Sequence, residues 1–156
     1  MAKIVLDTIP GPFSQIPRAY DHETNAVATM HDKFGILVSP KPTRLTRRKM
    51  GERIACLREE LEELIMAANN RDLPEMADAL VDLVVFAKGT AVMMGLPWAA
   101  LFDDVMRANL AKVRGVGKRG HKVDLIKPPG WQGPQGREIL LEHGYDPADS
   151  TEVDDE

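Results

Sequence analysis

Carboxylate side chains recur at helical spacing in two neighbouring segments of this chain. Six acids form the two rows: Glu59, Glu60, Glu63, Glu75, Asp78 and Asp82. Residues three, four or seven apart share one face of a helix, so each segment predicts a helix with a negative stripe. The second row interrupts an almost wholly apolar stretch, residues 73–94. Carboxylates in apolar surroundings are costly unless a cation pairs with them, and oxygen ligands suit a hard cation such as Mg²⁺. The spacing therefore indicates metal-assisted phosphate chemistry.

Each row also has a purely structural interpretation. Asp72 and Glu75 resemble a capping box, and acids in a first helical turn gain about 0.3–1 kcal/mol from the helix dipole. Glu59, Glu60 and Glu63 alone are typical of a solvated helix face. Asp82 lies beyond the reach of the dipole and among apolar neighbours. Because a short turn makes the two helices antiparallel neighbours, both rows together favour the metal site.

The elements that must position these acids are helical. Capping residues, prolines and apolar periodicity predict helices over about 21–34, 47–69, 72–94 and 97–113, with a short one near 135–143. Thr46 and Asp72 are the expected N-caps of the second and third helices. The second helix has an apolar stripe at Met50, Ile54, Leu57, Leu61, Leu64 and Ala68. We expect an all-α fold, with no strand outside an arm at residues 4–6.

Three further features of these helices carry expectations. Ala28, His31 and Phe34 are the inward-facing candidates of the first helix. Gly89 falls on the acidic face of the third helix, where it would leave space beside the carboxylates. That helix is apolar nearly all round, so it needs more partners than one short chain provides, which indicates an oligomer.

Several runs of residues in this chain resemble the sequence elements of one protein family. The run Glu59-Glu60-Leu61-Glu62-Glu63, followed by Glu75-Met76-Ala77-Asp78, resembles the E-E-x-x-E … E-x-x-D signature of MazG-like all-α nucleoside triphosphate pyrophosphohydrolases. Asn109 to Lys112 is similar to the N-x-x-K element of that family, which contacts the nucleotide. Residues 122–131, with Lys-Pro-Pro-Gly-Trp, are similar to the tail of short phage-borne members. The resemblance covers roughly residues 20–131, and the connector between the two acidic runs is short for the family.

The resemblance implies a four-helix-bundle core that assembles as a homodimer or homotetramer. It implies hydrolysis of a nucleoside triphosphate between the α- and β-phosphates, giving monophosphate and pyrophosphate. The expected ligands of Mg²⁺, or of Mn²⁺ in its place, are Glu60, Glu63, Glu75 and Asp78. Glu59 and Glu60 are the expected catalytic residues, with Glu59 positioning or deprotonating the water and Asp82 as the alternative.

The expected substrate contacts come from separate parts of the chain. Asn109 and Lys112 are carried over from the family element. His31 is either part of a base pocket or a core residue. Lys118 belongs to a glycine-rich basic segment, residues 114–122, which either grips phosphate or is a linker. This segment is not a P-loop, because the G-x-x-x-x-G-K-[ST] order is absent.

Three functions follow, in order of preference. The first is hydrolysis of a deoxynucleoside triphosphate, with dGTP as the narrower expectation from the similarity to phage members. The second is phosphoribosyl-ATP pyrophosphohydrolysis, the activity of a related fold in histidine synthesis. The third is a non-catalytic helical binding module whose acids serve capping and solubility.

Composition sets the outer bounds. At 156 residues the chain is one domain's worth, with an expected irregular arm at 1–19, the catalytic domain at 20–143 and an acidic disordered tail at 144–156. The single cysteine, Cys56, excludes an internal disulfide. Dispersed basic residues without an aromatic platform predict no nucleic-acid partner. No signal peptide or membrane span is expected, so we expect a cytoplasmic protein, in the host cytoplasm if the chain is phage-encoded.

Overall fold

Helices dominate the structure, a computed structural model that describes residues 21–115 and 124–154. Its elements are α1 (His22–Phe34), β1 (Arg44–Leu45), α2 (Arg47–Asn70), α3 (Leu73–Met93), α4 (Trp98–Leu110), β2 (Val113–Gly115), β3 (Asp124–Ile126), α5 (Gly136–Glu142) and β4 (Glu152–Val153). The expected all-α fold is confirmed. The irregular arm predicted at residues 1–19, with its strand at 4–6, lies outside the described residues.

Side-chain caps begin the first three helices. Asp21 accepts a hydrogen bond from the backbone N–H of Thr24 at 2.8 Å, and Thr46 accepts one from Lys49 at 3.1 Å. Asp72 accepts one from Glu75 at 3.3 Å. These bonds satisfy backbone donors that the first helical turn leaves unpaired. The predicted caps Thr46 and Asp72 are confirmed, and each fixes where its helix begins.

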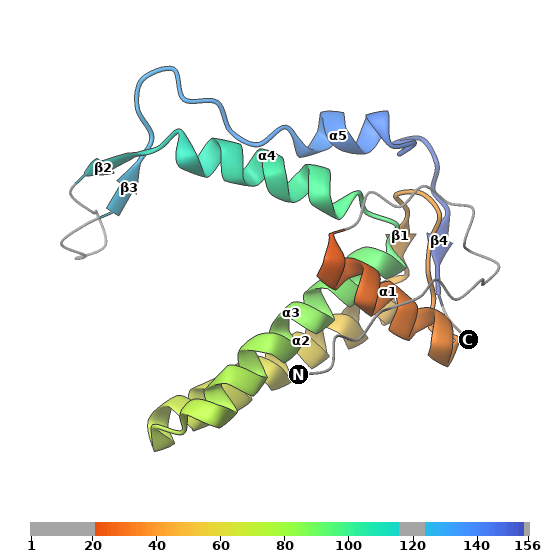
Figure 1. Cartoon of the computed structure of the whole chain (residues 1–156). Helices are drawn as coiled ribbons and strands as arrows, with labels where there is room; N and C mark the ends of the chain where they lie inside the picture. Colours follow the sequence, from red (N-terminus) through yellow and green to blue (C-terminus); the bar gives the residue numbers. More distant parts are fainter. Residues whose placement is uncertain (1–20, 116–123, 155–156) are drawn as a thin grey trace.

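The core lies where α1 crosses the C-terminal half of α3 (Figure 1). Val27 and Ala28 of α1 pack there with Val38 and Val92, all of them buried. The inward prediction holds for Ala28 and His31 but is wrong for Phe34, which is 66% exposed. The chain turns away directly after Phe34, at Gly35 with φ of 67°. No later turn of helix follows to hold that ring against α3.

The α2–α3 hairpin and α4 leave the core in different directions (Figure 1). Gly95 makes the turn between α3 and α4 with φ of 64°. A Cβ atom there would lie 2.3 Å from the carbonyl oxygen of Lys41, so only glycine fits. The hairpin therefore forms one limb, while α4, α5 and the β2–β3 pair form a second limb that diverges from it (Figure 1).

Both limbs expose large apolar side chains. On the hairpin these are Ile54, Leu61, Ile65, Met66, Leu73, Leu80, Val81 and Val84; on α4 they are Phe102, Val105, Met106 and Leu110. The α4 set has the spacing of a single helix face. In one copy of the chain these faces stay in contact with solvent.

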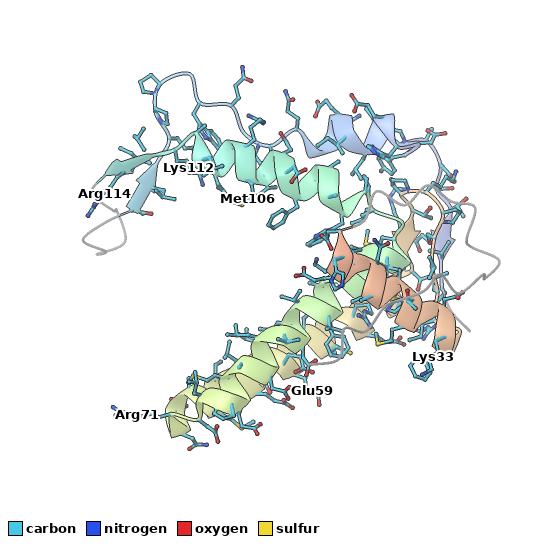
Figure 2. All side chains as sticks on the ribbon, viewed as in Figure 1. Lys33, Glu59, Arg71, Met106, Lys112 and Arg114 are labelled. Atoms are coloured by element: carbon cyan, nitrogen blue, oxygen red, sulfur yellow. The ribbon has the colours of Figure 1, made fainter. Side chains whose placement is uncertain are left out.

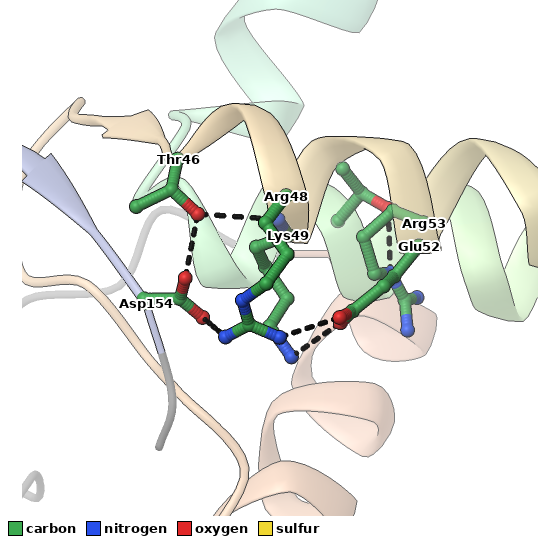
Figure 3. A network of polar contacts seen from close by, with 7 residues as sticks. Thr46, Arg48, Lys49, Glu52, Arg53 and Asp154 are labelled. Atoms are coloured by element: carbon green, nitrogen blue, oxygen red, sulfur yellow. Dashed lines mark hydrogen bonds and ion pairs between the residues drawn. The ribbon is translucent and has the colours of Figure 1, made fainter.

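The acidic tail differs from its prediction. Residues 145–154 return along the start of α2, where β4 pairs in parallel with β1. Asp154 accepts hydrogen bonds from Thr46 Oγ1 at 2.6 Å and from Arg48 Nη2 at 2.5 Å (Figure 3). Arg44 donates to the carbonyl oxygen of Asp149 and to the hydroxyl of Tyr145, both at 2.8 Å. The expectation of a disordered tail is wrong for these residues, because basic side chains near the start of α2 give them partners.

The strands are short additions to the helical frame. Both pairs contain two or three residues per strand, β1 with β4 in parallel and β2 with β3 antiparallel. Pieces of this length carry no alternating pattern, so the sequence analysis missed them. No helix in the described part of the chain is both long and apolar enough to cross a bilayer.

Candidate metal centre

Glu60 is the central acid of the site. It lies on α2, and its side chain faces α3, so the residue is only half-exposed. Its Oε2 atom is buried and has no hydrogen-bond partner among the described residues. A buried carboxylate oxygen without a partner is costly. Such an atom marks a position where a cation or a donor would lower the free energy.

The charges around Glu60 make this cost larger. Burial is the largest effect that raises the pKa of Glu60 above its ordinary value of 4.5, followed by the negative charges of Glu63 and Asp82. Glu59 and Asp78 raise this pKa further. Acids of both α2 and α3 therefore act on the pKa of one carboxyl group. The structure adds Asp82 to the acids that act most strongly on Glu60.

Glu75 acts less strongly on Glu60 than these four acids do. It is exposed, and its charge is not among the four that most raise the pKa of Glu60. Its backbone N–H instead belongs to the cap made by Asp72. Within residues 21–115 and 124–154, no three carboxylate, histidine or cysteine side chains converge closely enough to hold one metal ion. The ligand set Glu60, Glu63, Glu75 and Asp78 thus remains a prediction.

The donor chemistry nevertheless fits a hard divalent cation. Every neighbour that acts on Glu60 offers carboxylate oxygen, which is the ligand type of Mg²⁺. To reach a shared ion, the acids of α2 and α3 would have to adopt other rotamers than those of the described side chains. A cation beside Oε2 would supply its missing partner and offset the repulsion among the acids.

Gly89 has a different role from the predicted one. A Cβ atom there would lie 2.9 Å from Nη2 of Arg53 and 3.0 Å from Nε2 of His31. Arg53 donates to the carbonyl oxygen of Phe86 at 3.0 Å and to Thr90 Oγ1 at 3.1 Å. The glycine therefore makes room for two side chains in the helix packing, and not for a ligand beside the acids.

His31 belongs to the same packing. Its side chain is 2% exposed, and its Nδ1 lies 3.2 Å from the carbonyl oxygen of Leu37. Since the ring is covered by α3 and the following loop, a direct contact with a nucleotide base is not supported. The core alternative fits this position.

Asn109 and Lys112 lie together at the end of α4. Lys112 Nζ donates to Asn109 Oδ1 at 2.8 Å. Figure 2 shows Lys112 at the far end of α4, on the opposite limb from Glu59 on the hairpin. One copy of the chain therefore does not bring the N-x-x-K pair to the acids. Lys118, the remaining predicted contact, lies outside the described residues.

Two residues near these sites were not selected from the sequence. Arg53 sits about two turns from Glu60 on α2 and contacts α3, and Trp131 packs beside Lys112 at the end of α4. Helical spacing could have placed Arg53 near Glu60. The Trp131 contact joins segments separated by a loop, so no local pattern indicates it.

Comparison with protein families gives one match. The model of the family described as phosphoribosyl-ATP pyrophosphohydrolase matches residues 27–109, which is more than half of the chain. The matched region holds all six acids of the two rows and ends at Asn109. No curated protein matches the chain. The match identifies the chain at the level of a nucleotide pyrophosphohydrolase. The chain belongs to the phosphoribosyl-ATP pyrophosphohydrolase family.

Proposed function

We propose that the chain hydrolyses a deoxynucleoside triphosphate to the monophosphate and pyrophosphate, with a purine such as dGTP as substrate, in a reaction that requires Mg²⁺ or Mn²⁺. The observation that carries this proposal is Glu60, whose buried Oε2 has no partner while acids of two helices surround it. Proteins retain such an arrangement where a cation and its anionic ligand bind.

The proposed ligands are Glu60 and Glu63 of α2 with Glu75 and Asp78 of α3. When bound, the metal supplies charge that polarises phosphoryl oxygens and lowers the pKa of a water molecule. The acids of the chain also decide in which form the substrate binds. Their ring of negative charge repels a bare triphosphate, so the substrate binds together with its cation.

Two residues compete for the role of general base. Glu59 is exposed, so its carboxylate is open to a water molecule. Asp82 is half-buried and is one of the charges that raise the pKa of Glu60, so its carboxylate also acts on the shared carboxyl group. Asp82→Asn and Glu59→Gln, assayed at equal metal concentration, test this role. The general base is the residue whose substitution abolishes turnover.

The active form is proposed to be a homodimer or homotetramer with composite sites. The apolar face of α4, with Phe102 and Leu110 exposed, is suited to cover the apolar hairpin of a second copy. Such packing would carry the C-terminal end of α4, with the ammonium group of Lys112, toward the acids of that copy. The positive charge of Lys112 and the negative charges of the acids on the hairpin attract each other, and this attraction favours the pairing.

Phosphoribosyl-ATP is the second candidate substrate, because the matching family model is named for it. It shares the triphosphate and differs at the base, so the same acids would serve either substrate. A non-catalytic binding module is the third possibility from the sequence, and the family match gives it no support.

A substrate screen tests the proposal. The purified chain is incubated with each deoxynucleoside triphosphate, each ribonucleoside triphosphate and phosphoribosyl-ATP in Mg²⁺, and pyrophosphate release is measured. We expect the fastest release from a purine deoxynucleotide and none after EDTA. Diphosphate and orthophosphate as products, or turnover that survives EDTA, would refute the proposed reaction. Turnover of phosphoribosyl-ATP alone would replace the first substrate with the second.

A further inference from the structure

Two lysine side chains surround one indole ring at the end of α4. Lys127 Nζ lies 4.5 Å from the centre of the Trp131 ring, and Lys112 Nζ lies 5.8 Å from it. Both distances are within the range of cation–π attraction. The ring thus holds two ammonium groups as neighbours, although their charges repel each other.

The loop that carries Trp131 is fixed to α4 by a series of hydrogen bonds. The indole Nε1–H donates to the carbonyl oxygen of Ala108 at 2.7 Å. Farther along the loop, Arg107 Nη2 donates to the carbonyl oxygen of Gly133 at 3.1 Å, and the N–H of Gln135 donates to Asp104 at 2.5 Å. A ring held in this way is pre-organised to fix the position of the lysines beside it.

Neither ammonium group is neutralised within the described part of the chain. Lys112 donates to the neutral amide oxygen of Asn109, and Lys127 has only its contact with the ring. Lys88 provides a contrast, since it is buried between the carboxylates of Asp21 and Glu23 at 2.8 and 2.7 Å. Two unneutralised ammonium groups beside a rigid ring form a site for a polyvalent anion.

We propose that Lys127 binds the phosphate chain of the substrate together with Lys112, and that Trp131 is the positioning residue for both. This inference rests on the proposed function, in which Lys112 contacts the nucleotide. It goes beyond the family match, which ends at Asn109 and does not reach the loop.

Binding of inorganic tripolyphosphate in EDTA tests the anion site separately from the metal site. In a Trp98→Phe background Trp131 is the only tryptophan, and its fluorescence should change as tripolyphosphate binds; calorimetry on the chain with Trp98 intact gives the same constant without this substitution. Lys127→Met should weaken binding roughly 5- to 30-fold, the change expected for a lost interaction of one or two kcal/mol. The matched control is Lys33→Met, because Lys33 also lies over an aromatic ring, that of Phe34 at 5.1 Å, but on α1.

Trp131 is tested through its conservative variant and through kinetics. Measured by calorimetry, Trp131→Phe keeps a ring for the lysines but loses the N–H bond to Ala108, so it should retain more tripolyphosphate affinity than Trp131→Leu, which should lose affinity as Lys127→Met does. With substrate, Lys127→Met should raise KM more than it lowers kcat. Wild-type affinity of Lys127→Met for tripolyphosphate would overturn the inference while leaving the proposed hydrolysis intact. A chain that binds tripolyphosphate through Lys127 but releases no pyrophosphate in the screen would instead refute the proposed function.

Discussion

Glu60 is the acid on which the proposed metal site depends most. Glu60→Gln keeps the shape of the side chain and supplies a hydrogen-bond donor, but it removes the charge that burial and four acids oppose. We expect the metal-free variant to melt at a higher temperature than the wild type at pH 7–8. Turnover should fall roughly 100-fold or more, the range for loss of an essential group. Melting curves in EDTA, with an assay in Mg²⁺, check both expectations.

The pH dependence of this effect has a defined sign. Because the pKa of Glu60 is raised in the folded chain, the folded state binds more protons than the unfolded state just above pH 4.5. The wild type therefore loses stability as the pH rises from 4.5 through the folded pKa, and the advantage of Glu60→Gln should disappear below pH 4.5. Glu62→Gln is the control, since Glu62 is exposed on the other flank of α2. An equal gain in melting temperature in both variants would show that the charge of Glu60 is no more costly than that of an exposed acid.

Gly89 and Gly51 form a second test at the scale of single residues. Alanine at an exposed helical glycine gains about 1 kcal/mol of helix stability, and a Cβ at Gly51 meets nothing within 4 Å. Gly51→Ala should therefore raise the free energy of unfolding by about 1 kcal/mol. Gly89→Ala should lower it by roughly 1 kcal/mol, because displacing Arg53 from its two acceptors outweighs the same gain. Denaturant unfolding of both variants gives the comparison, and stabilisation by Gly89→Ala would contradict the packing role.

The sequence was a better guide to the acids that act on Glu60 than to the roles of the residues that pack nearby. Glu59, Glu60, Glu63, Asp78 and Asp82 follow helical periodicity, which is a local property, so two rows of acids were enough to bring them together. The role of Gly89 was misjudged, because it depends on how α1 crosses α3. That crossing is set by side-chain packing between distant segments, and no spacing within either helix encodes it.

At the scale of elements, the C-terminal segment makes a measurable contribution. Truncation after His143 removes β4, the cap partner Asp154 and the acceptors of Arg44. We expect the melting temperature to fall by roughly 5 °C or more, since a hydrogen bond contributes about 1 kcal/mol and each kcal/mol corresponds to about 2–4 °C in a chain of this size. A truncated chain that melts with the full-length protein would return this segment to a disordered tail.

Asp154 gives this contribution its pH dependence. The hydrogen bond from Thr46 is the largest of the effects that lower the pKa of Asp154 below its ordinary 3.8, and Arg48 lowers it further. The stabilisation is therefore complete well above pH 3.8 and is lost as the pH falls through the lower folded pKa. Asp154→Asn should melt below the wild type at pH 7 and approach it in strong acid. Glu152→Gln removes one charge from the same segment, where the Glu152 side chain has no hydrogen bond or ion pair with another described residue, and it should melt with the wild type at both pH values.

The helices and their caps were predictable, whereas the segment after α5 was not. Thr46 and Asp72 cap helices through contacts three residues away, so the signal lies in the local sequence. The ordering of residues 145–154 depends on Arg44 and Arg48, about a hundred positions earlier in the chain. Composition alone describes an acidic segment without knowledge of the basic surface that it meets.

At the scale of the whole molecule, the acids and the N-x-x-K pair stand on different limbs. Figure 2 shows this separation between Glu59 and Lys112. The sequence predicted both elements and an oligomer, but it could not say that one copy leaves them apart. That outcome follows from the turn at Gly95, which directs α4 away from the hairpin. Composite sites between copies are the arrangement that would reunite them.

Complementation between two inactive variants tests composite sites directly. Glu60→Gln and Lys112→Met should each abolish turnover in a pure homo-oligomer. If each site takes its acids from one copy and Lys112 from another, a mixed dimer regains one intact site, built from the acids of one variant and the lysine of the other. Random pairing after co-refolding makes half of the dimers mixed, so activity should recover to about a quarter of the wild-type value. Sites within a single copy would give no recovery at all, because every chain carries one defect.

Leu110→Lys, which places a charge on the exposed face of α4, should prevent both assembly and recovery while leaving the α2 and α3 acids unchanged, as light scattering and the same assay would show.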